Sequence, residues 1–166
     1  MENSKWKSLG YILLGECQIR STNQVGEAIR YDSRKGFVGL SRRASQFCVY
    51  SVNFGTSARL EDFRESSSLP LILGVNGKIL TICKDSHRVR VEDIPPDGPP
   101  TNAILRYFRG KLGRNTVSFS PVDFPDYWLR HSNSRIIVCN LLYILRTTSS
   151  STLLILGPVS MRTHLL

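Results

Sequence analysis

The sequence predicts an all-β fold. Short segments of apolar, β-branched and aromatic residues recur at intervals of about 8 to 12 residues, and turn residues separate them. No long stretch follows the period of a helix. Internal similarity is the third observation, and it predicts that the strands form a threefold repeat rather than an irregular sheet.

The repeat is clearest between the two ends of the chain. A shift of 100 residues lays 18–38 on 118–138, so that strand-like segments and the turns between them coincide. A weaker middle copy appears when a shift of 57 residues lays 71–80 on 128–137. Three copies at this spacing predict one threefold all-β unit.

The expected strands lie where apolar residues alternate with polar ones or form short runs between turn residues. In chain order they are 9–14, 16–21, 28–31, 37–40, 46–52, 59–63, 71–73, 78–83, 89–91 and 103–108, followed by three strands within 116–138. Asn76-Gly77 is the strongest hairpin signal, because a type I′ turn requires a positive φ at both central residues. The four prolines of 95–100 predict a surface loop.

One run of the chain resembles a known family. The run VSFSPVDFPDYWLRHSNSRIIV at 117–138, preceded by NAILRYFRGKLGRN at 102–115, resembles the repeat of the AbfB-type domain. That family is an arabinose-binding β-trefoil module attached to arabinofuranosidases. The resemblance is specific at 116–138, looser at 18–47, and does not reach 141–166. It implies a β-trefoil whose third repeat is incomplete or divergent.

The chain length fits this architecture, because 166 residues bury one substantial core. We assign 9–140 to a β-trefoil-like domain, and 1–8 to a flexible N-terminal arm. The repeats are expected at about 9–53, 58–108 and 116–140. The divergent segment 141–166 leaves two alternatives open: its apolar runs complete the barrel, or it is an aberrant end on a truncated domain.

The resemblance also implies a sugar site. Each pocket of the family uses the histidine of an Arg-His pair, an aspartate of the following strand and a nearby aromatic ring. Imidazole and carboxylate hydrogen-bond the hydroxyls, and the ring covers the apolar face of the sugar. This places His131 and Arg130 in the third copy, Tyr31 at the histidine position of the first, and Asn102 at the aspartate position of the second. Tyr127 is the candidate aromatic platform.

No copy holds both polar partners. In the third copy the aspartate is missing, because no acidic residue follows Asp126. In the second copy Leu73 and Gly74 occupy the Arg-His positions. The pockets are therefore predicted to be degenerate, and a structural role for His131 remains an alternative.

Charge and cysteine content limit the partners. The formal net charge of +9 favours weak contact with polyanions, but the basic residues are scattered, which disfavours nucleic acid as the partner. Four cysteines lack zinc-site spacing, so no metal is expected, and they form either two disulfides or buried thiols. No segment reaches the roughly 20 apolar residues of a membrane span. The N-terminus lacks a signal peptide of the usual form, which favours an intracellular location.

The sequence carries no catalytic motif. A glycosidase needs two supported carboxylates, whereas the acidic residues at 61–65 and 92–93 lie in loop or edge segments. No GxSxG or glycine-rich phosphate loop occurs, so neither an enzyme nor a cofactor is expected. We therefore predict a non-catalytic carbohydrate-binding, lectin-like module. The alternatives are a protein-interaction trefoil of the cytokine or scaffold type and a divergent domain without binding.

Overall fold

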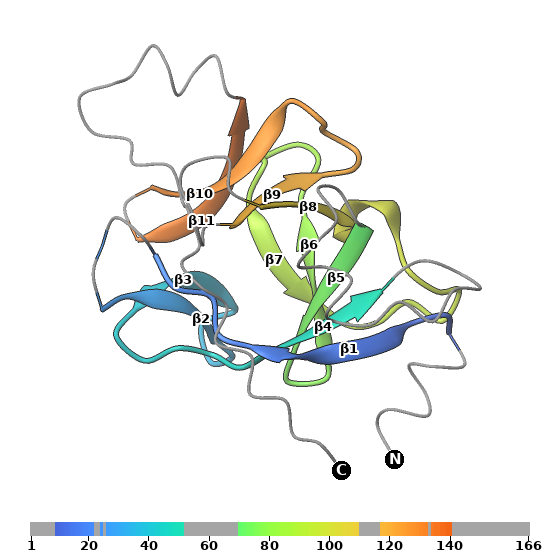
Figure 1. The fold of residues 1–166 in the computed structure, drawn as a ribbon, viewed down its shortest axis with the longest axis horizontal. Coiled ribbons are helices and arrows are strands. Elements are labelled where there is room, and N and C mark those ends of the chain that lie inside the picture. The colour runs from blue at the N-terminus through green and yellow to red at the C-terminus, as the bar shows by residue number, and fades with distance from the viewer. Residues whose placement is uncertain are drawn as a thin grey trace.

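The regular elements of the described residues are β-strands, apart from one short 3₁₀ turn (Figure 1). The computed structural model describes residues 9–21, 24, 26–51, 70–109, 117–132 and 134–140. Their elements are β1 (Ile12–Cys17), β2 (Ala28–Asp32), β3 (Phe37–Ser41), β4 (Phe47–Ser51), β5 (Pro70–Val75), β6 (Lys78–Ile82), β7 (Val89–Glu92), η1 (Thr101–Ala103), β8 (Leu105–Arg109), β9 (Val117–Pro121), β10 (Tyr127–Ser132) and β11 (Arg135–Asn140). The only helical element among them, η1, is a single 3₁₀ turn. The all-β prediction is confirmed.

The strands form two sheets in which every pairing is antiparallel. The larger sheet holds β1, β4, β5, β6 and β7 in that order, with β8 joining β5 to β9. The smaller sheet has the order β10-β11-β3-β2. No pairing closes either sheet into a barrel within the described residues.

The pairings repeat along the chain. Among the first four strands, β1 pairs with β4 while β2 and β3 form a hairpin. Among the next four, β5 pairs with β8 while β6 pairs with β7. β10 and β11 form a third hairpin after β9. Two successive groups of four strands therefore share one pairing pattern.

The main core lies between the two sheets and receives side chains from both. Strands β4, β5 and β6 also pack against a second cluster around Tyr11 and Tyr50, whose rings meet edge to face. Leu71 and Leu73 face the main core, whereas Ile72 between them faces the second cluster. Burial on both faces explains why this part of the sequence is a continuous apolar run instead of an alternating one.

The three hairpins meet along β3, the start of β7 and the first half of β11. The Leu40 amide donates to the Ser134 carbonyl at 2.9 Å, and the Val138 amide donates to the His87 carbonyl at 2.9 Å. Arg88 forms a bridge with Ile137. These backbone contacts hold the three hairpins together; we call this meeting point the hairpin junction.

Several local predictions can be compared with the structure. The Asn76-Gly77 hairpin is confirmed, because the two residues have φ of 52° and 72° and join β5 to β6. The two strands predicted at 9–14 and 16–21 are wrong, since one strand, β1, continues through Gly15 with a shift of register. The strand predicted at 103–108 begins only at Leu105, after the turn η1.

The middle alignment lays β5 and β6 on β10 and β11, and both pairs form antiparallel hairpins. The two pairs differ in their other neighbours, because β5 also pairs with β4 and β8, whereas β11 also pairs with β3. β6 forms a further antiparallel pair with β7. The predictions for 1–8, 59–63 and 141–166 lie outside the described residues.

The described parts of the chain contain no helix of the length and hydropathy that crossing a membrane requires. They also contain no group of three metal-ligating side chains suited to holding an ion. All four cysteines are free thiols, and burial raises the pKa of Cys17 to about 12.

Candidate functional site

The five predicted site residues lie on three elements. Tyr127, Arg130 and His131 belong to β10, Tyr31 to β2, and Asn102 to η1. The surroundings of each residue show whether it is open to a ligand.

Arg130 and His131 are enclosed, with exposed fractions of 4% and 6%. The Arg130 Nε and Nη1 atoms and the His131 Nε2 atom form no hydrogen bond with any part of the chain that the structure describes. Glu27, whose Oε2 is similarly unbonded, lies near enough to act electrostatically on the imidazole. The acidic group that acts on His131 therefore comes from the segment before β2 rather than from the strand after β10, and it forms no ion pair with the imidazole among the described residues.

The environment of His131 disfavours its charged form. Burial is the largest cause that lowers the pKa of the imidazole, and the adjacent Arg130 guanidinium lowers it further, while Glu27 opposes both. His131 is therefore held as a neutral imidazole.

This shift makes stability depend on pH. In the unfolded chain the His131 imidazole takes up a proton near its ordinary pKa of 6.5, whereas in the folded protein it does so only at lower pH. Acidification therefore favours unfolding. We expect the contribution of His131 to be fully present above pH 6.5 and lost as the pH falls through the folded pKa. Urea unfolding from pH 7.5 downward measures it, and His131→Gln should flatten the profile. An unchanged profile in that variant would show that His131 is not its source.

Tyr31 and Asn102 each make a structural contact. The Tyr31 amide donates to Ser45 Oγ at 2.9 Å, and its side chain packs against the main core. Asn102 Nδ2 donates to the Ile82 carbonyl at 3.3 Å, which ties η1 to β6. These contacts position both residues without excluding them from a neighbouring site.

Tyr127 belongs to a cluster of three half-buried rings. The His87 ring lies 4.7 Å from the Tyr127 ring and 5.2 Å from the Phe124 ring, centre to centre. Phe124 and Tyr127 are 5.7 Å apart. We call His87, Phe124 and Tyr127 the aromatic patch. Because all three side chains remain partly exposed, the patch offers ring surface to a ligand.

A carboxylate stands beside the aromatic patch. Asp123 precedes Phe124, and its Oδ2 accepts a hydrogen bond from Thr101 Oγ1 at 3.0 Å. Lys84 Nζ lies 3.4 Å from the same oxygen, and the Asp123 side chain is 20% exposed. Of the five predicted residues, Tyr127 belongs to this surface, whereas the Asn102 side chain donates to the Ile82 carbonyl. The carboxylate is held in place and still reachable by a small polar ligand.

His87 reaches the patch by means of an uncommon backbone conformation. Its φ is 53°, which residues with a side chain adopt at some cost. Backbone hydrogen bonds fix it on both sides, from its amide to the Cys83 carbonyl and from the Val138 amide to its own carbonyl, each at 2.9 Å. Strained backbone held in this way is concentrated at functional sites.

The arrangement is suited to recognition of a polyol. Aromatic faces cover apolar C–H surface, while a carboxylate accepts hydrogen bonds from hydroxyl groups. Sequence reasoning missed Asp123, Phe124 and His87. Asp123 and Phe124 could have been predicted, because they directly precede the turn before Tyr127. His87 could not have been predicted, since it lies in the loop between β6 and β7.

No protein-family model matches the chain, and no curated protein matches it either.

Proposed function

We propose that the protein is a non-catalytic carbohydrate-binding domain of β-trefoil architecture. A β-trefoil repeats a four-strand unit in which the outer strands join a barrel and the inner two form a hairpin. The ladder through β1, β4, β5, β8 and β9 and the three hairpins support this architecture. The strand that would pair β9 with β1 is expected from 141–166, outside the described residues.

Equivalent hairpin positions support the threefold repeat. Ile29, Leu80 and Leu129 are buried in β2, β6 and β10, and the second lies 51 residues after the first and 49 before the third. Their partners across each hairpin are Leu40, Val91 and Val138, and all six residues belong to or pack against the main core. This register replaces the middle alignment made from sequence, and it puts Thr81-Ile82 rather than Leu73-Gly74 at the Arg-His positions.

The aromatic patch is the proposed sugar-binding site. The observation that carries the proposal is that three half-buried rings stand beside a carboxylate that Thr101 holds in place. Tyr127 supplies ring surface, and Asp123 accepts hydrogen bonds from the sugar hydroxyls. The resemblance to the AbfB-type repeat suggests arabinose-type or related sugars. Because Arg130 and His131 are enclosed, they are secondary candidates that require β10 or its neighbours to move.

The His87→Gly variant tests this site. Glycine adopts positive φ without cost, which should stabilise the variant by about 0.5 kcal/mol. Loss of the His87 ring contacts offsets this gain, so the variant should be about as stable as the wild type. Glycan binding should nevertheless fall about tenfold, because an aromatic contact contributes on the order of 1 kcal/mol or more. Calorimetric titration with arabino-oligosaccharides, after a glycan-array screen, measures the affinity.

The matched control is Asn76→Gly, since Asn76 has nearly the same φ of 52° but lies in the β5–β6 turn. It should keep full affinity. Equal loss in both variants would contradict the proposed site. If the folded wild type binds no pentose or hexose glycan but captures a protein partner, the interaction-domain alternative replaces the proposal.

A further inference from the structure

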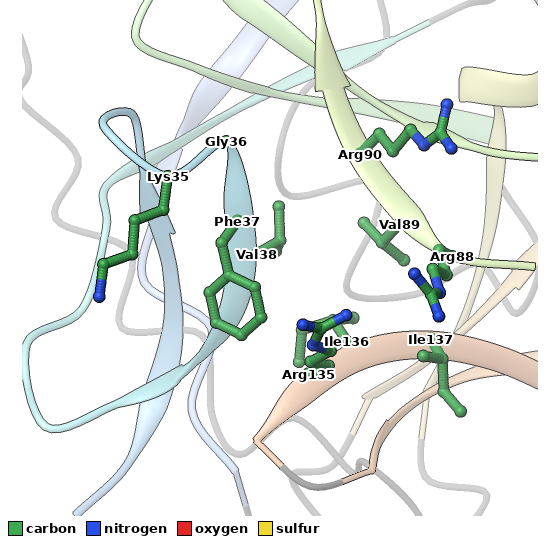
Figure 2. Close-up of a pocket in the computed structure, with 10 residues that line it drawn as sticks. All are labelled: Lys35, Gly36, Phe37, Val38, Arg88, Val89, Arg90, Arg135, Ile136 and Ile137. Atoms are coloured by element: carbon green, nitrogen blue, oxygen red, sulfur yellow. The ribbon is translucent and has the colours of Figure 1, made fainter.

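A second surface feature lies at the hairpin junction, where β3, β7 and β11 surround a cavity of about 220 Å³ (Figure 2). Its lining includes Lys35, Arg88, Arg90 and Arg135 and contains no acidic residue. None of the five predicted site residues and no member of the aromatic patch lines it. The cavity is therefore a separate candidate site.

Strand register puts the three arginines on one side of the junction. Arg88 pairs with Ile137 across the bridge between β7 and β11. Directly opposed residues face the same side of a sheet, and so do residues two apart in a strand. Arg90 therefore faces the same side as Arg88, and Arg135 the same side as Ile137. Figure 2 shows Arg88 and Arg135 extending into the space between the two strands.

The opposite side of the same strands is apolar. Val38, Val89 and Ile136 are buried in the main core, with exposed fractions of 3%, 7% and 2%. One side of these strands therefore packs on the main core, and the other side carries the charged side chains. We call this part of the hairpin junction the platform. Cations on such a platform lose little conformational freedom in their backbone when a ligand binds.

Arg135 is further positioned by an aromatic ring. Its guanidinium carbon lies 5.5 Å from the centre of the Phe37 ring. The ring occupies the space next to Gly39, which pairs with Arg135. A cation that stacks on a ring in this way keeps its N–H groups free for an anion.

The charge of the platform is not neutralised by its neighbours. No ion pair joins any of the four cations to an acidic group in the described portions of the chain. The nearest acid along β7 that faces the same side as Arg90 is Glu92, two residues on, and it does not line the cavity. Unpaired cations that line one cavity over a low-dielectric core produce a focused positive potential.

We propose that the hairpin junction binds the sulfate or phosphate groups of a small polyanionic ligand. A planar guanidinium donates two parallel hydrogen bonds to such an oxyanion. An esterified sulfate or phosphate keeps three free oxygens and can accept hydrogen bonds from two arginines at once. One carboxylate has two oxygens, which a single guanidinium already satisfies. The cavity is smaller than the roughly 300 Å³ at which pockets for whole small molecules begin, so it takes an anionic group of a larger ligand.

The test compares two variants of the full chain with the same charge. Arg88→Gln combined with Arg135→Gln removes two junction cations, and Arg42→Gln combined with Arg43→Gln removes two exposed cations between β3 and β4. Each reduces the formal net charge from +9 to +7, since two positive charges are lost. Calorimetry with sucrose octasulfate and inositol hexakisphosphate separates a sulfate source from a phosphate source, and citrate is the carboxylate probe.

The junction variant should weaken binding of at least one of the first two probes about tenfold for each arginine removed, because hydrogen bonds to charged groups contribute at that level. Its thermal midpoint should match that of the wild type. The control variant should keep its affinity within about twofold, in line with screened surface charge. Equal loss in both variants, unchanged binding in the junction variant, or citrate binding as tightly as the other probes would overturn the proposal.

Discussion

Replacing Gly39 by alanine is expected to lower the free energy of unfolding by about 2–3 kcal/mol, at the upper part of the range for overpacked positions. A methyl group there would overlap the Phe37 ring and the Ser134 carbonyl oxygen. The same carbonyl accepts the Leu40 amide, which is one of the bonds between the hairpins. The ring can rotate away, but the backbone carbonyl cannot move without separating β3 from the turn before β11. Denaturant unfolding measures the loss.

The control for this prediction is Gly36→Ala. Gly36 has a φ of 59°, and a methyl group at that position meets no atom within 4 Å. Its cost is confined to the backbone, at about 1 kcal/mol. If Gly39→Ala costs no more than Gly36→Ala, the close packing of the three hairpins at the junction is contradicted.

Replacing Arg130 by methionine is expected to stabilise the protein by about 1–2 kcal/mol. The guanidinium is 4% exposed, and its Nε and Nη1 have no acceptor among the described residues. Burying a charged group without full hydrogen bonding is unfavourable, and an unbranched apolar side chain fills similar space. The charge also acts on the Cys139 thiol, whose pKa burial raises and Arg130 lowers. Thermal and urea unfolding of the variant give the change.

The matched variant Arg130→Lys keeps the buried charge and should be no more stable than the wild type. Loss of stability in Arg130→Met beyond that of Arg130→Lys would reveal an acceptor that compensates the guanidinium. The same proteins test the role that the family resemblance assigns to Arg130. A methionine variant that is more stable but no longer binds glycan would make Arg130 a sugar contact, whereas retained binding would leave the contact to the aromatic patch.

Local signals in the sequence predicted local structure well. Asn76-Gly77 formed the expected turn because its conformation depends on two residues with positive φ. The matched segments 18–38 and 118–138 contain β2 and β10, in which Ile29 and Leu129 are both buried. The comparison of 71–80 with 128–137 fixes no register, because β5 and β6 are buried on both faces and their apolar runs fit several registers.

The candidate site was only partly predictable, because it is assembled from separate loops. Tyr127 was named because it lies within the family-like run, and Asn102 was named from the aspartate position that the resemblance gives the second copy. His87 and Asp123 come together through contacts between the β6–β7 and β9–β10 connections, and pairing between distant segments leaves no mark in local composition. The junction arginines were visible only as scattered charges, because strand register alone puts Arg88, Arg90 and Arg135 on one side.

The central claim is that sugars bind at the aromatic patch, and nuclear magnetic resonance of the aromatic side chains tests it most directly. During titration with an arabino-oligosaccharide, the ring signals of His87, Phe124 and Tyr127 should shift together and saturate at one dissociation constant. The imidazole of the enclosed His131 should shift less. Ring signals that stay unchanged while the ligand saturates the protein elsewhere, or an absence of any saturable shift, would contradict the claim.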